Sequence, residues 1–288
     1  MALAFALTIG HVPTGAAGAP LLVEAEWLAP KLADRHVVVL HVGSRASYDQ
    51  AHIPGARLIS EEDVARPHDM ARGDLMLELP EPAAIRHTLE SLGISDDSTV
   101  VVYAAGETPL QSATRIVFTL TYVGLGAETS LLNGGLASWQ KAGLATTTMA
   151  PAVAPGHLSE RPVAPVVVDA SFVQSLSGRA RHVLVDARAP VFYNGTEPTF
   201  GKRGHIPKAV NIPFSSISDA SGRISLPDLK RTFDAAGIRP GDTVVAYCHV
   251  GQQATAVVLA ARLLNVPVML YDGAFQDWAT RNRGAVEP

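Results

Sequence analysis

The sequence predicts two tandem α/β domains, each a largely parallel β-sheet flanked by helices. Three observations support this fold class. The two halves of the chain repeat the same blocks in the same order, short β-branched runs alternate with segments of helical period, and a proline-rich stretch separates the halves. With 288 residues, 47% of them apolar, the chain is long enough to bury a core in each half.

The repeat consists of three pairs of matching blocks. Each block of the first half returns once in the second half and the order is preserved, which indicates duplication of one unit. The pairs are AHIPGA at 51–56 with GHIPKA at 204–209, STVVVYAAG at 98–106 with DTVVAYCHVG at 242–251, and LNGGLASW at 132–139 with YDGAFQDW at 271–278.

The predicted strands are almost continuously apolar, as strands buried on both faces of a parallel sheet are. They are HVVVLHV at 36–42, TVVVY at 99–103, HVLVDA at 182–187 and TVVAY at 243–247.

The predicted helices show apolar residues at a spacing near 3.6. PAAIRHTLESLGI and LPDLKRTFDAAGI carry Gly93 and Gly237 where a helix C-terminus is expected, and TAVVLAARLL follows the only cysteine. Alternation of these helices with the strands indicates α/β layers in both halves.

The domain boundary is expected in TTTMAPAVAPGHLSERPVAP, where four prolines forbid a regular helix and favour an extended connection. The predicted organisation is an N-terminal extension at 1–18, a first domain at 19–147, a linker at 148–165 and a second domain at 166–288.

Charge and hydropathy narrow the partners. A net charge of −4 without a Lys/Arg cluster gives no footprint for nucleic acid or a membrane surface, so a small molecule is the expected partner. No run of 18 apolar residues suggests a membrane span. The apolar N-terminus lacks the Lys or Arg of a secretory signal and is interrupted by polar residues, so a cytoplasmic location is favoured over export.

Cys248 is the only cysteine, which excludes an intramolecular disulfide and a multi-cysteine zinc site. It falls at the carboxyl end of a predicted parallel strand, where α/β sheets place their ligands. Gly251 lets the following chain turn back, so its amides form a cup for an anion above a helix N-terminus. That field is expected to lower the thiol pKa and make Cys248 a nucleophile.

A purely structural buried cysteine is the alternative interpretation. The polar neighbours of Cys248 argue against it, and Ala104 at the matching position shows that the fold does not require sulfur there. His249 is adjacent in a tight loop and is expected to point away from the thiol rather than act as its base. His52 in the first half and His205 in the second occupy matching positions, so a structural hydrogen bond shared by both halves explains them best.

Four blocks together resemble the tandem rhodanese-like sulfurtransferases. They are LVDAR at 184–188, GHIPKAVNIP at 204–213, VVAYCHVGQQA at 244–254 and YDGAFQDW at 271–278. The first half repeats them weakly. The resemblance implies two tandem rhodanese-like domains, of which the second is catalytic and the first inactive.

The resemblance also implies roles for individual residues and no metal or organic cofactor. Cys248 matches the nucleophile that carries sulfur as a persulfide, Arg188 matches a basic residue that positions the anionic donor, and Asp186 orients the loop or the arginine. In the first half His41 stands in place of Asp186 and Gly43 in place of Arg188, so both the thiol and the anion handle are missing there. The residues that match the cradle around the persulfide are His249, Val250, Gly251, Gln252 and Gln253.

The implied reaction moves sulfur from a small anionic donor to a thiophilic acceptor, cyanide or a thiol. Thiosulfate is the favoured donor because His249 is large and potentially cationic. The alternatives are 3-mercaptopyruvate as donor, or a sulfur carrier or thiol sensor without turnover. A cysteine phosphatase is disfavoured, because the arginine it requires six residues beyond the nucleophile is replaced by Ala254.

Two further features are assigned to structure. Trp139 and Trp278 each follow a Gly turn and are expected to anchor the last helix of a domain on its sheet. The acidic segment 60–82 is expected to be a solvated connection or part of the surface between the domains.

Overall fold

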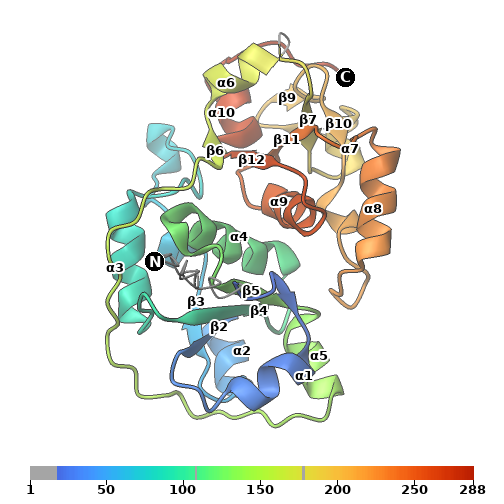
Figure 1. Ribbon diagram of the computed structural model, residues 1–288. Helices are drawn as coiled ribbons and strands as arrows, with labels where there is room; N and C mark the ends of the chain where they lie inside the picture. Colours follow the sequence, from blue (N-terminus) through green and yellow to red (C-terminus); the bar gives the residue numbers. More distant parts are fainter. Residues whose placement is uncertain (1–17, 108, 177–178) are drawn as a thin grey trace, which may run out of the picture.

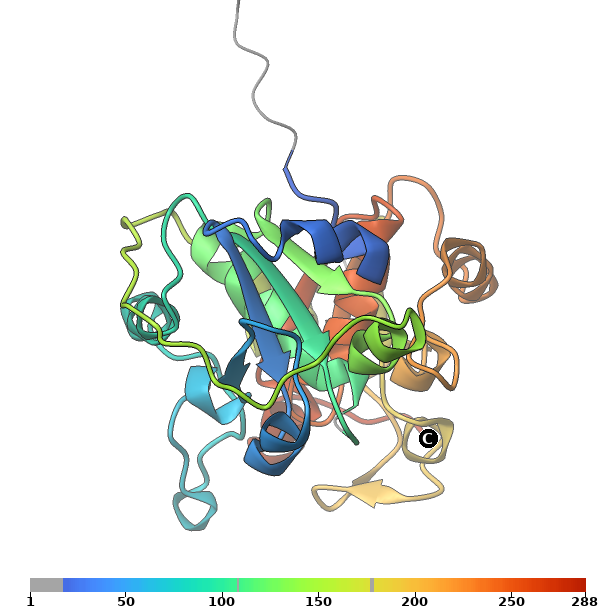
Figure 2. The same cartoon turned by 90° about the horizontal axis from the view of Figure 1, so that it is seen from below.

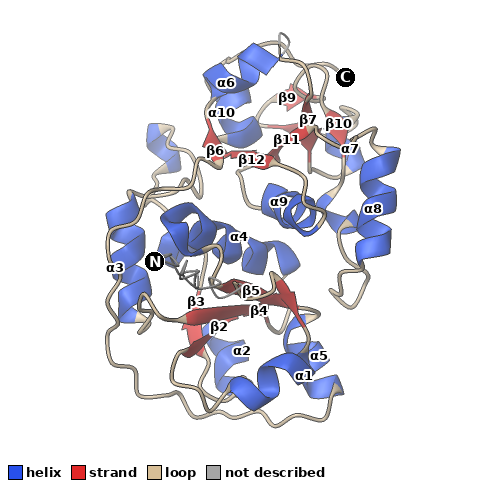
Figure 3. Cartoon of the chain, in the orientation of Figure 1, coloured by secondary structure: helices blue, strands red, loops and turns tan. Residues whose placement is uncertain are grey.

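The computed structural model describes residues 18–288 except 108 and 177–178. The interpretation of the N-terminal extension concerns residues that lie, apart from Gly18, outside this range. Two sheets are stacked one above the other, and helices α4 (Leu110–Leu120) and α9 (Ala254–Leu263) lie between them (Figures 1 and 3). The predicted α/β class is confirmed.

Each domain contains one five-stranded parallel sheet. The strand order is β1-β5-β4-β2-β3 in the first and β6-β12-β11-β7-β10 in the second, so the two sheets have the same topology. The first comprises β1 Leu22–Val23, β2 Val37–Val42, β3 Arg57–Ile59, β4 Thr99–Ala104 and β5 Thr129–Leu132; the second comprises β6 Val167–Val168, β7 His182–Asp186, β10 Val210–Asn211, β11 Thr243–Tyr247 and β12 Val268–Tyr271. A small antiparallel hairpin, β8 Pro198–Thr199 with β9 Lys202–Arg203, is added to the second domain.

The other helices complete the layers. Figure 2 shows the outer face of the first sheet, which α1, α2 and α5 cover. The helices are α1 Ala25–Leu28, α2 Arg45–Gln50, α3 Pro82–Ser91, α5 Gly135–Lys141, α6 Ala170–Ser175, α7 Pro190–Tyr193, α8 Leu226–Ala235 and α10 Ala274–Thr280, with short helical turns at Ala29–Lys31, Glu62–Val64, Met70–Arg72, Thr121–Leu125 and Phe214–Ser216.

The predicted strands and helices are confirmed to within a few residues. Gly93 and Gly237 follow α3 and α8 with φ of +71° and +83°, the left-handed conformation in which glycine terminates a helix at least cost.

The main hydrophobic core runs through both domains, because the inner faces of both sheets pack on α4 and α9. Within that contact the hydroxyls of Thr114 and Thr255 lie 2.7 Å apart. These residues occupy the same place in the repeated segments QSATR and QQATA. Helices α4 and α9 therefore occupy corresponding places in the two domains, and each of them faces the other domain.

The linker is extended, as its prolines predict, but it is not free. The amide of Leu158 donates to Glu90, and the amide of Ala164 donates to the carbonyl of Tyr122, both in the first domain. Ser159 bonds to Asp96 through its hydroxyl and its amide. The linker is thus fastened along the first domain beside α3 (Figure 1).

The two copies also share side-chain interactions. Nδ1 of His52 lies 2.7 Å from the carbonyl of Tyr48, and Nδ1 of His205 lies 2.9 Å from that of Tyr193. The shared structural role of the two histidines is confirmed. Trp139 and Trp278 are buried, and each donates its indole N–H to the chain after the last helix, which confirms them as anchors.

Candidate active site

Cys248 directly follows β11, the central strand of the second sheet, at its carboxyl end. Its side chain is fully buried. The strands beside β11 end at the same edge, so Asp186, which is paired in register with Tyr247, lies next to the cysteine loop. The structure therefore brings the expected nucleophile and the Asp186–Arg188 segment together.

The loop after Cys248 folds as a cup. Backbone N–H groups of Ala254, Val250 and Gly251 act on the thiol and favour its charged form. Gly251 has a φ of +83°, and a Cβ at this position would meet the carbonyl oxygen of Asp272 at 2.7 Å. Both the turn and the close approach require glycine.

The pKa of the Cys248 thiol is nevertheless raised above its ordinary value, because complete burial penalises the thiolate more than the amides stabilise it. The carboxylate of Asp186 raises it further. The expectation of a lowered thiol pKa is therefore wrong for this closed site. The amide cup reduces the cost of burial without overcoming it.

Contrary to the prediction, Arg188 does not extend toward the place of a donor. It is fully buried, and its Nε lies 3.0 Å from both carboxylate oxygens of Asp186, while Nη2 lies 2.5 Å from Oδ2. Nη2 also donates to the carbonyl of Gly204 at 2.8 Å, and the guanidinium carbon stands 3.9 Å from the ring centre of Phe275. The guanidinium thus neutralises and orients Asp186 beneath the loop. In this geometry Arg188 is not an external anion handle, and that prediction is wrong.

His249 is not a cationic residue at neutral pH. Burial, followed by the positive charge of Arg188, lowers its pKa to about 4. Its ring packs edge to face against Phe192 of α7, with ring centres 4.7 Å apart. The histidine therefore contributes a neutral aromatic surface beside Cys248.

Gln252, near the end of the loop, contacts the first domain. Nε2 of Gln252 donates to both carboxylate oxygens of Glu61, at 2.7 and 2.9 Å, and to the hydroxyl of Ser112 at 3.2 Å. Oε1 of Gln253 is buried and has no hydrogen-bond partner among the residues that the structure describes. Burial raises the pKa of Glu61, although the bond from Gln252 opposes this shift.

The sequence did not identify four residues around the loop. Glu61 and the segment after it form part of the surface between the domains. Of the two interpretations of segment 60–82, a solvated connection or part of this surface, the second applies. Asp272 lies in the repeated block at 271–278, whose sequence by itself indicates no chemistry. Phe192 and Arg115 carried no recognisable signal, since each reaches the loop only through the tertiary fold.

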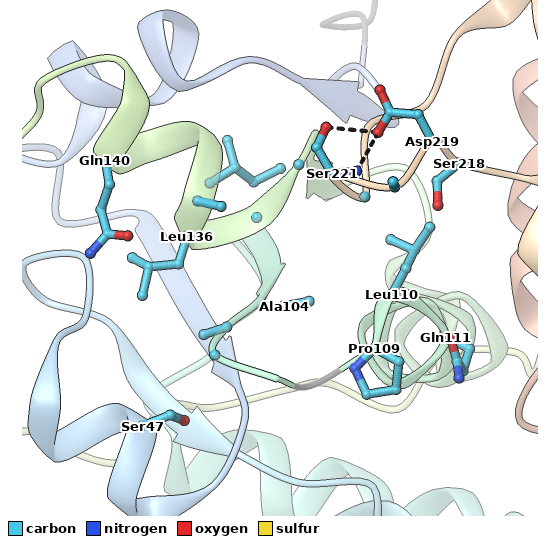
Figure 4. A pocket seen from close by; sticks show the side chains of 18 of the residues that line it. Ser47, Ala104, Pro109, Leu110, Gln111, Leu136, Gln140, Ser218, Asp219 and Ser221 are labelled. Atoms are coloured by element: carbon cyan, nitrogen blue, oxygen red, sulfur yellow. Dashed lines mark hydrogen bonds between the residues drawn. The ribbon is translucent and has the colours of Figure 1, made fainter.

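The corresponding edge of the first domain has no thiol. His41 is paired in register with Tyr103 as Asp186 is with Tyr247, and Nδ1 of His41 lies 2.9 Å from the Tyr103 hydroxyl. A cavity of about 910 Å³ opens beside Ala104. Figure 4 shows it between Ala104, the start of α4 at Leu110 and Gln111, and the loop of the second domain that carries Asp219 and Ser221.

Within the described ranges, no group of three or more His, Cys, Asp or Glu side chains is arranged to hold a metal ion. In the same part of the chain, no helix has both the length and the apolar character needed to cross a membrane.

Fold and site together define a tandem α/β protein with a cysteine held in an amide cup on its second copy. A family profile described as "Rhodanese-like domain" matches residues 24–142 and 169–281. The chain belongs to the tandem rhodanese-like sulfurtransferase family.

Similar proteins carry both donor names. The chain is 34% identical over 280 residues to a probable 3-mercaptopyruvate sulfurtransferase of Pseudomonas aeruginosa, covering 92% of this chain and 97% of that protein. It is 31% identical over 279 residues to a thiosulfate sulfurtransferase of Gallus gallus, covering 94% and 90%. The crystal structure of SseA from Escherichia coli, a 3-mercaptopyruvate sulfotransferase, superposes with a TM-score of 0.77 at 28% identity, covering 89% of this chain and 99% of that one.

Proposed function

We propose that this sulfurtransferase takes sulfur from 3-mercaptopyruvate onto Cys248 and passes it to a small thiophilic acceptor. The observation that carries the proposal is the Cys248 thiol held among the amides of its own loop at the carboxyl end of β11. An amide cup stabilises negative charge on sulfur and requires no cofactor.

The reaction proceeds in two balanced steps. The Cys248 thiolate attacks the sulfur of 3-mercaptopyruvate, an S–S bond forms, and the C–S bond breaks. Its electron pair leaves with the three-carbon fragment, which takes up a proton and becomes pyruvate. The acceptor then attacks the outer sulfur of the persulfide, and the electron pair of the S–S bond returns to Cys248 as thiolate.

The charges around the thiol favour this donor over thiosulfate. Thiosulfate would bring two negative charges into a buried site that already contains the Asp186 carboxylate. The guanidinium of Arg188 is paired with that carboxylate and does not face a donor. The two supports expected for thiosulfate, an available Arg188 and a cationic His249, are absent from this geometry. 3-Mercaptopyruvate has a single charge, three carbons along from the attacked sulfur, so its carboxylate need not enter the cup.

Two of the relatives described above, the probable 3-mercaptopyruvate sulfurtransferase of Pseudomonas aeruginosa and SseA, carry the name of this donor, which supports the same proposal. In this proposal Cys248 is the nucleophile, Asp186 and Arg188 are positioning residues, and the loop from His249 to Gln253 forms the wall of the site.

The test is steady-state sulfur transfer to cyanide with each donor, with thiocyanate measured as product and pyruvate followed for the mercaptopyruvate reaction. A higher kcat/KM with 3-mercaptopyruvate, and one sulfur atom of added mass on Cys248 after donor treatment, support the proposal. Preference for thiosulfate would overturn the donor assignment, and a wild-type rate from Cys248→Ala would overturn the nucleophile.

Service as a thiol sensor is the other alternative. A sensor would be oxidised at Cys248 without turning over a sulfur donor, so multiple turnovers with 3-mercaptopyruvate would exclude it. A carrier that accepts sulfur without turnover would give one equivalent of thiocyanate per protein, and multiple turnovers distinguish the enzyme from it.

A further inference from the structure

A side chain of the first domain reaches the cysteine loop of the second. Arg115 lies on α4 and is 2% exposed. Its Nη1 donates to the carbonyl of Gly251 at 3.3 Å and to Oδ1 of Asp272 at 2.7 Å. Its Nη2 donates to the carbonyl of Leu77 in the interdomain segment. One guanidinium therefore joins three separate parts of the chain around the loop.

The bond to Gly251 bears on the orientation of the cup. A trans peptide is planar, so its C=O and N–H point in opposite directions. Holding the Gly251 carbonyl toward Arg115 turns the N–H of Gln252 away from Arg115. Gly251 is also the residue whose φ of +83° reverses the chain and whose own N–H acts on the thiol. The arginine thus restrains the peptide at the turn of the cradle.

Asp272 makes this arrangement rigid. Its Oδ1 accepts from Arg115, and its Oδ2 accepts from the amide of Leu79 at 2.9 Å. Its backbone oxygen lies within 2.7 Å of where a Cβ of Gly251 would be. A buried guanidinium paired with a carboxylate that is itself hydrogen-bonded has one preferred position, because any other leaves a charge without partners.

The duplication shows that the arginine is not a requirement of the helix. In the matched segments QSATR and QQATA, Arg115 corresponds to Ala256 of α9. Ala256 lines the cavity of the first domain, beside the edge that has no thiol. Helix α4, which faces the cysteine loop, has an arginine at this position, and helix α9, which faces the edge without a thiol, has an alanine.

We infer that Arg115 is a positioning residue of the active site, through which the inactive domain holds the Gly251 turn of the Cys248 loop in its reactive conformation. This inference rests on the proposed role of Cys248. It gives the first domain a part in the reaction that does not require it to bind a substrate.

The test compares Arg115→Met and Arg115→Lys with Arg262→Met. Methionine removes the three hydrogen bonds, whereas lysine keeps the charge beside Asp272 but lacks the planar fork that reaches two carbonyls at once. Arg262 is a matched control, because it bonds across the domain contact from α9 to Thr121 and to the carbonyl of Gly126, away from the cysteine loop.

Two readouts separate positioning from stability. The first is kcat and KM with 3-mercaptopyruvate below the unfolding temperature of each variant. The second is the pH dependence of alkylation by iodoacetamide, which reports on Cys248 alone because the chain has one cysteine. Alkylation needs no turnover, so it remains informative if the proposed donor is wrong.

Arg115→Met is expected to lower kcat by about 10- to 100-fold, with a smaller change in KM, because misplacing a preorganised group affects the reacting state most. Its alkylation profile is expected to shift to higher pH by about half a unit or more, since displaced amides stabilise the thiolate less. Arg115→Lys should fall between wild type and Arg115→Met. Arg262→Met should lower only the melting temperature.

A folded Arg115→Met with wild-type kcat and alkylation profile would overturn the inference. If that variant does not fold, the decision falls to Arg115→Lys, and wild-type values for both readouts there would equally overturn it. Absence of sulfur transfer by the wild type, with the alkylation shift intact, would count against the proposed function and leave the positioning role standing.

Discussion

The carboxyl edges of the two sheets are built alike and differ in their chemistry. In the second domain the segment ending at Leu79 covers the edge and is bonded to Asp272; in the first, the segment ending at Ile224 covers it and is bonded to Asn133. Each edge is thus closed by the other domain. The difference lies in what the cover encloses, a buried thiol on one side and an open cavity on the other.

Loop length is a second difference between the edges. Six residues (105–110) separate Ala104 from Gln111, whereas three (249–251) separate Cys248 from Gln252. The short loop has to turn on Gly251 against Asp272, which places several amides around one atom. The comparison indicates that the candidate active site depends on a tight loop and on its contacts with the first domain, as well as on the cysteine.

The largest effect is expected from exchanging the residue that distinguishes the two edges. Cys248→Ala should reduce sulfur transfer to background, because no other thiol exists in the chain, while the fold persists as it does around Ala104. Thiocyanate formation and the melting temperature are the measurements.

The reciprocal variant, Ala104→Cys in the Cys248→Ala background, should stay inactive, because the loop after residue 104 is longer than the loop that forms the cup after Cys248. Sulfur transfer restored by that variant would show that the cysteine alone separates the two copies.

The next largest effect concerns the buried pair beneath the cup. Arg188→Ala leaves Asp186 buried without its partner and should cost about 3–5 kcal/mol of stability. It should also lower kcat, because the uncompensated carboxylate opposes the thiolate. Chemical denaturation and steady-state kinetics check both effects. A stable variant with only a raised donor KM would restore Arg188 as a direct contact to the donor.

The fold was readable from the sequence because strand period, helix period and the repeat all agree. Cys248 and its loop were readable because a lone cysteine after a buried strand has a definite place in an α/β domain. The states of the groups around it were not. The pairing of Arg188 with Asp186, the neutral His249 and the raised pKa of Cys248 all follow from burial, which depends on contacts distant in the chain.

A smaller effect is expected at the turn of the loop. Gly251→Ala places a Cβ against the Asp272 carbonyl in a left-handed conformation, so the loop must shift and kcat should fall by about 10-fold or more. The matched control is Gly106→Ala in the first domain, which also has a positive φ, of +62°, but is exposed. The control should lose stability without losing kcat, and equal loss of kcat in both variants would deny the Gly251 turn a special role.

The smallest effect is expected from His249, and it is a matter of pH. Because its pKa is about 4, the imidazole is neutral from about pH 5 upward, and its protonation cannot shape the rate near neutrality. The thiol has its pKa raised, so the reactive thiolate increases with pH and the rate should rise toward alkaline pH. His249→Ala should keep this rising profile and change kcat/KM by less than about 5-fold, because it removes an aromatic contact with Phe192 and no charge. A bell-shaped or neutral-pH inflection that disappears in His249→Ala would instead make the histidine an acid or base. The difference between the two sheet edges would then be explained by a titrating side chain, and burial and loop shape would not be its cause.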